Sequence, residues 1–295
     1  MGNDSPGRPL VSIVITVKNE ERHLARLLDS LLVQEPPVEI VVVDALSRDR
    51  TFAIAQRYAS EHPEVVRVAR KFGSRGIGRN AGVALARGDL VAFIDGDCIA
   101  DSQWVRAIRT GFQSAEVVAG RTVAVGSSRY VRLERVELFQ QGSDVTYPSC
   151  NLAYRRARFE ELRGFDPRFI TAEDIDLNLR AVQAGARIRY VPFAVVYHQM
   201  RTTFTRFLMQ AFWNGYGRKQ LTEKHGSLWG NYRMRRLLEG QRSVVALLRL
   251  AAAFSGYATR IVTGPSSKEA DRARAAATAP AGRGTSSSSE ARRPS

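Results

Sequence analysis

The chain has 295 residues, of which 44% are hydrophobic and 25% charged, proportions typical of a soluble globular protein with one large or two small domains. Its formal net charge of +15 predicts attraction to a polyanion: nucleic acid, an anionic membrane surface or phosphorylated substrates. Two cysteines, Cys98 and Cys150, make neither a disulfide framework nor a zinc pattern, which favours a reducing cytosolic setting.

The first 70 residues alternate between strand and helix patterns. Residues 1–8 are polar and lack the apolar core of a signal peptide, so we expect any catalysis to take place inside the cell. Residues 10–16, 38–44 and 65–69 predict buried strands, and leucines at helical spacing predict a helix over 24–31. A second helix is expected from Thr51. This alternation is typical of a parallel α/β sheet with right-handed crossovers.

Glycines and arginines follow the third strand. Gly73, Gly76, Gly78 and Gly82 are interspersed with Arg75 and Arg79 in the stretch 73–82. The glycines alone could merely loosen a loop. Together with the arginines, ahead of a helix predicted over 80–86, they indicate a loop that faces the phosphates of a ligand.

Two aspartates end the next buried strand. Residues 90–94 are apolar and lead into Asp95-Gly96-Asp97. An Asp-Gly turn would explain this pattern without any ligand. However, Thr16 and Asp44 also follow strands, and ligands of such sheets bind at the carboxyl ends of the strands. We therefore expect Asp95 and Asp97 to hold Mg²⁺ or Mn²⁺.

Further elements lead to a second acidic cluster. We expect a helix over 104–112, a strand over 117–125 interrupted at Gly120, a helix over 130–141 and a short strand within 148–156 that ends in a basic turn. Glu173, Asp174 and Asp176 then begin a helix, and three acidic residues in four positions exceed what helix capping needs. One of these carboxylates could act as a general base.

The last predicted strand, over 187–197, is followed by His198. On the residues alone a structural histidine is favoured over a metal ligand. Between residues 200 and 249, ten residues are basic and two are acidic, so positive charge is concentrated there. Residues 244–262 are largely apolar but include Arg249 and Arg260, which favours an in-plane helix on an anionic membrane over a spanning one. A helix packed on the core is nearly as well supported.

Six motifs resemble the family 2 glycosyltransferases, in the order that family has them. They are Val-Ser-Ile-Val-Ile-Thr-Val-Lys-Asn-Glu (11–20), Val-Asp-Ala-Leu-Ser-Arg-Asp-Arg-Thr (43–51), Gly-Arg-Asn-Ala-Gly (78–82), Ala-Arg-Gly-Asp (86–89), Asp-Gly-Asp (95–97) and Glu173-Asp174. The resemblance covers residues 10–200. It implies a GT-A fold with a Rossmann-like, doubly wound mixed sheet, a nucleotide-sugar donor such as a UDP- or GDP-sugar, inversion at the anomeric carbon and a divalent cation, Mn²⁺ or Mg²⁺.

The resemblance also implies roles for individual residues. Asp174 resembles the catalytic base, Asp97 resembles the more direct metal ligand, and His198 matches a histidine that completes the metal shell in some members. The implied donor-binding residues are Thr16, Lys18, Glu20, Asp44, Arg75, Arg79 and Asp95; the implied acceptor-binding residues are Asn151, Glu173 and Trp213; the implied metal ligands are Asp95, Asp97 and His198.

The implied organisation is a disordered segment over 1–9, a catalytic domain over 10–200, a basic helical extension over 201–264 and a disordered tail over 265–295. Members with a similar extension are membrane-associated and build exopolysaccharide or lipid-linked glycans, which suggests a peripheral location at the inner face of the plasma membrane and a glycan or lipid-linked acceptor. Ala45 replaces a second aspartate found in many members and leaves the nucleobase open. Gln210-Ala-Phe-Trp213 lacks the arginine of processive synthases, so a single addition is expected.

Two other functions fit part of the pattern. A sugar-phosphate nucleotidyltransferase also combines such a sheet with metal-binding aspartates, but its glycine-rich loop would directly follow the first strand, where this chain has Val17-Lys18-Asn19-Glu20. A nucleic-acid-binding protein fits the charge, yet its basic residues would interleave with aromatics on a recognition element. Here they surround an apolar stripe, and no nucleic-acid partner is expected.

Overall fold

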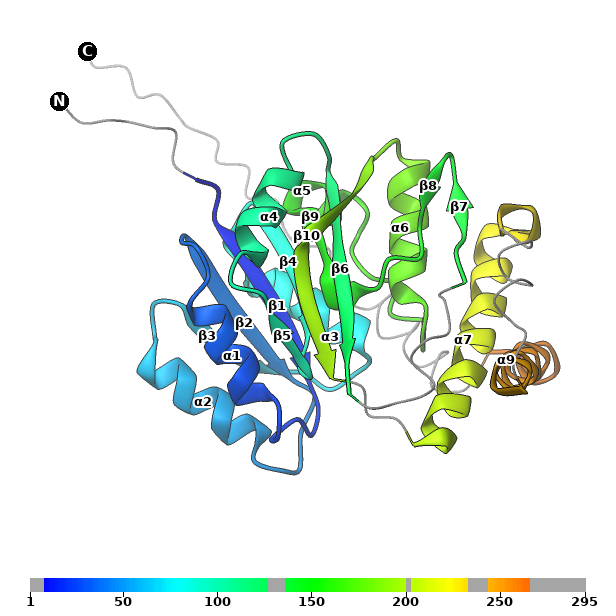
Figure 1. The fold of residues 1–295 in the computed structure, drawn as a ribbon, viewed down its shortest axis with the longest axis horizontal. Coiled ribbons are helices and arrows are strands. Elements are labelled where there is room, and N and C mark those ends of the chain that lie inside the picture. The colour runs from blue at the N-terminus through cyan, green and yellow to red at the C-terminus, as the bar shows by residue number, and fades with distance from the viewer. Residues whose placement is uncertain (1–7, 127–135, 200–202, 233–243, 266–295) are drawn as a thin grey trace, which may run out of the picture.

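One mixed sheet with helices on both faces forms the body of the molecule (Figure 1). The computed structural model describes residues 8–126, 136–199, 203–232 and 244–265. The strands are β1 (Val11–Val17), β2 (Val38–Asp44), β3 (Val66–Arg70), β4 (Leu90–Asp95), β5 (Cys98–Ala100), β6 (Val117–Val125), β9 (Leu152–Arg155) and β10 (Ile188–Gln199), with β7 (Phe139–Gln140) and β8 (Ser143–Asp144) as a separate pair. The helices are α1 (Leu24–Leu32), α2 (Thr51–Glu61), α3 (Arg75–Leu85), α4 (Trp104–Gly111), α5 (Arg156–Glu161), α6 (Glu173–Gln183), α7 (Phe204–His225) and α9 (Val244–Thr263), with short 3₁₀ turns η1 (Ser149–Asn151) and η2 (Trp229–Asn231).

The eight strands of the main sheet lie in the order β3-β2-β1-β4-β9-β6-β10-β5. The first four are parallel, β9 is antiparallel to β4 and β6, and β5 is antiparallel to β10. The sheet is therefore mixed, as the family resemblance implies. In this order β1 lies between β2 and β4, and the three strands are parallel, so their carboxyl ends are neighbours.

The strands β1, β2 and β4 are mainly apolar because helices cover both of their faces. Val11, Ile13 and Ile15 of β1 point toward the layer of α1, α2 and α4, whereas Val14 points toward α3, α5 and α6. All four side chains are fully buried. Burial of each such side chain contributes about 1.5–3 kcal/mol, so these strands are stabilised by lying between two layers of helices.

Most of the predicted elements are confirmed, with differences in the middle of the chain. The predicted helix over 130–141 is wrong where it can be checked, since Phe139–Gln140 forms β7; residues 130–135 lie outside the described residues. Gly120 does not interrupt β6, because its missing Cβ makes room for the Asn151 side chain and the Ala194 carbonyl. β10 extends to Gln199 and so contains His198. Disorder is expected over 1–9 and 265–295, and of these segments all but residues 8, 9 and 265 lie outside the described residues.

The glycine-rich stretch 73–82 is largely helical, which corrects the predicted phosphate-facing loop. α3 begins at Arg75 and is capped by Ser74. A Cβ on Gly78 would lie 2.8 Å from Thr16 Cγ2, and one on Gly82 would lie 2.4 Å from Val14 Cγ1. Real Cβ atoms do not approach other carbons so closely, so these glycines let α3 lie directly on β1. Their spacing of four residues puts them on one face of the helix.

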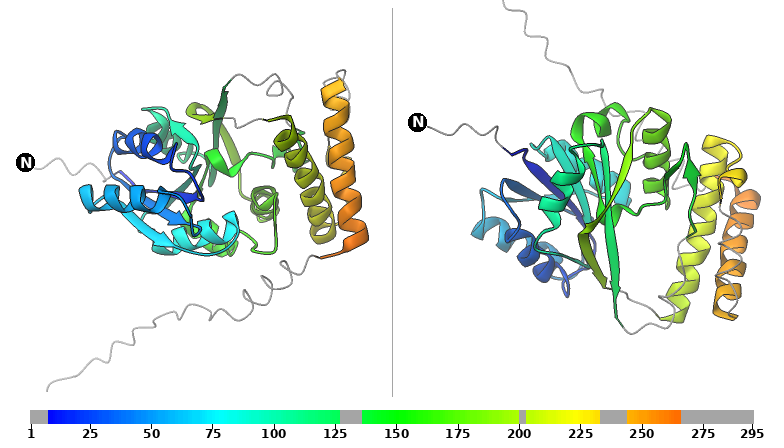
Figure 2. Two further views of the ribbon diagram at one scale, coloured as in Figure 1. Left: turned by 90° about the horizontal axis from the view of Figure 1, so that it is seen from below. Right: turned by 45° about the horizontal axis from the view of Figure 1, so that its top comes forward.

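A third apolar cluster joins the sheet to the C-terminal helices. Leu179 and Val182 of α6 pack with Leu221 of α7 and Leu228 beyond it. α7 lies between α6 and α9, and α9 lies on the outer side of α7, away from the sheet (Figures 1 and 2). Among the described residues, α9 is the one helix whose length and mean hydropathy of 1.3 match a membrane span.

Candidate functional site

Predicted site residues from three strands meet at one edge of the sheet. Thr16 and Asp95 are register partners in β1 and β4, and Val17 is the register partner of Asp44 in β2. The expected convergence of Thr16, Asp44 and Asp95 at the carboxyl ends is therefore confirmed. Gly96 lets the next loop approach, since a Cβ there would lie 2.8 Å from Val17 Cγ1 and 3.1 Å from Glu20 Cγ.

The loops after β1 and β2 are held to each other by hydrogen bonds. The Asn19 side-chain oxygen accepts from the Arg48 N–H (2.9 Å), and the Thr51 hydroxyl accepts from the Glu20 N–H (2.7 Å). Asp44 is buried, and its carboxylate accepts from the Ser47 N–H and from Arg70 Nε at 3.1 Å. Asp44 thus holds the loop after β2 in place. In the loop after β1, Lys18 is exposed and Glu20 is half-buried.

Arg79 joins two carboxylates across the site. Its guanidinium is 1% exposed, with Nη2 2.8 Å from Asp95 Oδ1 and Nη1 2.8 Å from Glu173 Oε1. Burial alone would raise the pKa of Asp95, but the charges of Arg79 and Arg75 hold it below its usual value. Because both ends of the guanidinium are paired inside the protein, Arg79 connects β4 to α6, whereas Arg75 is exposed.

Three possible metal ligands gather beside Asp95. One ligand atom each from Asp97, Cys98 and His198 lies within 4.8 Å of the other two. His198 Nε2 is 3.2 Å from Asp97 Oδ1, and this hydrogen bond is the main reason why the pKa of His198 rises to about 9. Carboxylate, imidazole and thiol are all metal-binding groups, so the residues present fit a divalent cation. Asp95 is instead paired with Arg79, and its role as a direct ligand stays a prediction.

Cys98 was missed as a candidate ligand. It is buried in β5 and is the antiparallel register partner of His198 in β10, which puts both side chains on the same face of the sheet. Its thiol also hydrogen-bonds the Cys150 thiol. Its position next to Asp97 was visible in the sequence, but the pairing of β5 with β10 was not.

Asp174 is the accessible carboxylate at the start of α6. The Ser149 N–H donates to Asp174 Oδ2 (3.1 Å), and the Ile175 N–H donates to Oδ1 (2.9 Å). Asp174 is half-buried, while the neighbouring Glu173 is 7% exposed. Burial and the adjacent charge of Asp174 raise the pKa of Glu173. Of the two, Asp174 is the one that an incoming molecule can reach.

Two of the three residues assigned to the acceptor have internal partners instead. Asn151 is 2% exposed; its Oδ1 accepts from Trp104 Nε1 (2.9 Å) and its Nδ2 donates to the carbonyls of Arg121 and Ala194. This side chain ties η1 to β6 and β10, and its contact with an acceptor stays a prediction. Glu173 is likewise occupied by Arg79. Trp213 is 38% exposed on α7, and its contact with an acceptor stays a prediction.

The comparisons with known sequences agree on one family. The model of glycosyl transferase family 2 matches residues 12–166, and that of glycosyl transferase family group 2 matches residues 90–268. The chain is 30% identical over 234 residues to the pre-mycofactocin glycosyltransferase of Mycobacterium tuberculosis, covering 71% of this chain and 47% of that protein. It is 27% identical over 213 residues to the O-antigen chain rhamnosyltransferase RfbN of Salmonella typhimurium, covering 65% and 67%. The chain thus spans about half the length of the mycobacterial relative.

Solved structures share the fold. The mannosyltransferase PcManGT from Pyrobaculum calidifontis, in complex with GDP-Man and Mn²⁺, superposes with a TM-score of 0.62 at 20% identity over 92% of this chain and 81% of that one. TarS of S. aureus in complex with UDP-GlcNAc superposes with a TM-score of 0.53 at 16% identity, over 90% and 92%. The mixed sheet, the motifs and the matched family model together show that the chain belongs to glycosyl transferase family 2 and has the GT-A fold.

Proposed function

We propose that this protein is an inverting, metal-dependent glycosyltransferase that moves one sugar from a nucleotide-sugar donor to a hydroxyl of a glycan or lipid-linked acceptor. One observation carries the proposal. Arg79 pairs with both Asp95 and Glu173. It thereby links the accessible carboxylate of Asp174, next to Glu173, to the possible metal ligands Asp97 and His198, next to Asp95. The GDP-Man and UDP-GlcNAc in the complexes of PcManGT and TarS support a donor of this class.

The chemistry follows from the charges of these residues. Asp174 accepts the proton of the acceptor hydroxyl while that oxygen attacks the anomeric carbon, and the bond from this carbon to the diphosphate breaks on the opposite face. This geometry inverts the anomeric centre. Asp97 and His198 would hold a divalent cation, which, when bound, supplies positive charge against the departing diphosphate. Lys18, Glu20 and Arg75, which are exposed or half-buried, are proposed to bind the donor.

Incubation with a panel of nucleotide sugars tests the function. We expect UDP, GDP or dTDP to be released from one class of UDP-, GDP- or dTDP-sugar in the presence of Mn²⁺, and EDTA to stop the release. The Asp174→Asn variant serves as the matched control for contaminating hydrolases. If no sugar nucleotide reacts while a sugar phosphate and a nucleoside triphosphate yield pyrophosphate, the protein is a nucleotidyltransferase instead.

We further propose that α7 and α9 attach the protein to the inner face of the plasma membrane. The two helices meet backbone to backbone, since a Cβ on Gly256 would lie 1.9 Å from the Phe212 carbonyl oxygen. Arg260 is buried at this contact, with Nη2 2.7 Å from Glu223 Oε2. α9 therefore lies along α7 rather than apart from it. Large exposed apolar side chains remain on its outer face: Val244, Leu247, Leu248, Phe254, Ile261 and Val262. Together with the excess of basic over acidic residues between positions 200 and 249 of the sequence, this face suits an anionic bilayer surface.

Flotation with anionic liposomes tests the attachment. The double variant Leu247→Asp/Phe254→Asp is expected to lower the liposome-bound fraction more than tenfold, because each side chain contributes about 1.5–3 kcal/mol when it leaves water. Phe193→Asp is the matched control, since Phe193 is 78% exposed but lies in β10. Equal flotation of the double variant and the control would contradict the proposal, and a gel shift with DNA would then point to nucleic acid.

A further inference from the structure

We propose that the C-terminal half of α7 is a positioning element that holds the Asp174 end of α6 in its active place. The inference rests on the proposed role of Asp174 as the base. It assigns a role in the reaction to side chains of α7, a helix outside the sheet.

The backbone before α6 adopts a conformation that needs support. Ala172 has φ of +63°, in the left-handed region that residues with a Cβ disfavour. It directly precedes Glu173 and Asp174, so it sets the direction in which α6 begins. The N-cap residue Ala172 has no hydrogen-bonding side chain, so it makes no side-chain cap that would fix this backbone. The loop must be held by contacts from elsewhere.

α7 supplies such contacts along the loop. A Cβ on Gly217 would lie 2.7 Å from Thr171 Cγ2 and 3.1 Å from Ala172 Cβ, so the helix approaches the loop at the left-handed residue itself. One turn later, the buried Gln220 side chain accepts from the Ile170 N–H (3.5 Å) and donates to the Arg168 carbonyl (3.4 Å). Both partners of Gln220 are backbone groups of the loop.

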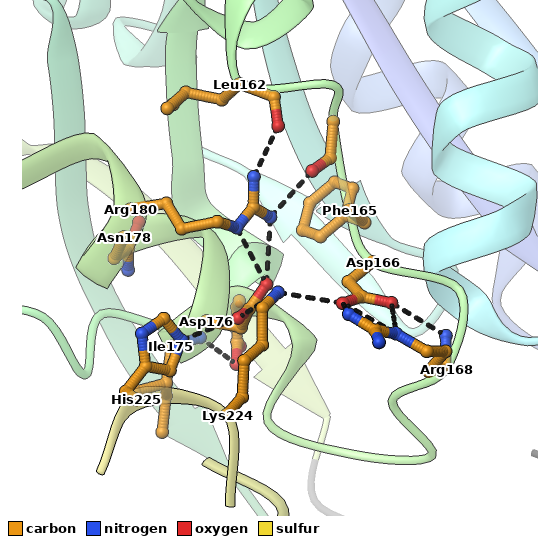
Figure 3. Close-up of polar contacts among 12 residues, drawn as sticks. Leu162, Phe165, Asp166, Arg168, Ile175, Asp176, Asn178, Arg180, Lys224 and His225 are labelled. Atoms are coloured by element: carbon orange, nitrogen blue, oxygen red, sulfur yellow. Dashed lines mark hydrogen bonds and ion pairs between the residues drawn. The ribbon is translucent and has the colours of Figure 1, made fainter. Parts of the chain in front are cut away.

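The end of α7 adds an ionic cluster (Figure 3). Lys224 Nζ lies 2.7 Å from Asp166 Oδ2 and 2.7 Å from Asp176 Oδ1. His225 Nε2 lies 2.8 Å from the same Asp176 oxygen, and Arg180 Nη2 lies 2.8 Å from Asp176 Oδ2. The Asp176 side chain is fully buried. Burial alone would raise its pKa, but His225, Arg180 and Lys224 hold it below the usual value.

The cluster therefore connects both ends of the loop. Lys224 links Asp166, where the loop begins, to Asp176 in the first turn of α6. Asp174 lies two residues before Asp176 and is held on its other side by the Ser149 N–H. A shift of α6 by about 1 Å would move this carboxylate out of line with the acceptor hydroxyl, and misplacement of that size can cost about 10²-fold in rate.

Two lysines of α7 offer a matched pair of variants. Lys224 and Lys219 have similarly exposed side chains (25% and 23%), but Lys219 Nζ faces Glu223 of α7 itself at 3.8 Å. We expect Lys224→Met to lower kcat for sugar transfer at least tenfold, with the donor KM and donor affinity within about twofold of the wild type. Lys219→Met is expected to leave all three unchanged. Parallel loss of kcat and donor affinity in Lys224→Met would show a merely structural role and overturn the proposal.

Amide hydrogen exchange gives a readout that needs no activity. In Lys224→Met, exchange of residues 166–174 should rise at least tenfold, while exchange in α3 stays at the wild-type rate. Gln220→Ala, which removes contacts but no charge, should give the same pattern with a smaller amplitude if Lys224→Met does not fold. Unchanged exchange of 166–174 refutes the positioning role. If the wild type transfers no sugar but the exchange pattern appears, the proposed function fails and the support of the loop by α7 stands.

Discussion

Asp174→Asn is expected to lower the rate of sugar transfer by about 10²–10⁴-fold while nucleotide binding stays within a few-fold of the wild type. In the wild type the Ser149 N–H donates to the Asp174 carboxylate at 3.1 Å. The asparagine has the same shape, and its side-chain oxygen can still accept this hydrogen bond. It has no basic oxygen to take the acceptor proton. Transfer rates under saturating donor measure the first effect, and calorimetric titration with the nucleotide measures the second.

Glu173→Gln is the informative comparison, because Glu173 is the adjacent carboxylate. Its burial raises its pKa, which is also a property of some general bases, but its Oε1 is 2.8 Å from Arg79 and it is 7% exposed. We expect this variant to lose stability and activity together, since removing one partner leaves the buried Arg79 with less compensation. If Glu173→Gln instead abolishes transfer with full stability while Asp174→Asn turns over, the two roles are reversed.

The strands around the site could be predicted because their sequence pattern is local. Residues 11–17, 38–44 and 90–95 are mainly apolar and carry a polar residue, Thr16, Asp44 or Asp95, at or next to their carboxyl ends. Parallel strands bring such ends together. The order of the motifs then identified the family. Neither step needs contacts between distant parts of the chain.

The features that the motifs do not reveal concern residues whose partners are far away in the sequence. Gly78 looked like a loop glycine, and what distinguishes it is contact with Thr16 across the α3–β1 interface. Arg79 carries the charge expected of a diphosphate ligand, yet it is satisfied by Glu173, 94 residues further on. Asn151 likewise depends on Trp104 and Ala194. A polar residue in a motif can stabilise the site or touch the ligand, and the motif is the same in both cases.

Asp97→Ala is expected to weaken donor binding about 10- to 100-fold in the presence of Mn²⁺ and to change it little in the presence of EDTA. The reason is that Asp97 is the carboxylate among the three possible metal ligands Asp97, Cys98 and His198. Asp95, in contrast, is already paired with Arg79 at 2.8 Å. Calorimetric titration of the donor, with Mn²⁺ and with EDTA, measures the difference. Identical isotherms for the wild type and Asp97→Ala under both conditions would refute the assignment.

Asp95→Asn is the matched comparison for this metal assignment, since it changes a carboxylate two residues away on the same turn. Its oxygen can still accept from Arg79, so the link to Glu173 is kept, and a smaller loss of Mn²⁺-dependent affinity is expected than for Asp97→Ala. An equal or larger loss in Asp95→Asn would make Asp95 the more direct ligand. His198 lies in β10, whereas Asp95 ends β4 and Asp97 follows it in the chain. The two outcomes therefore also decide whether the cation is held jointly by Asp97 and His198 or by the two aspartates at the end of β4.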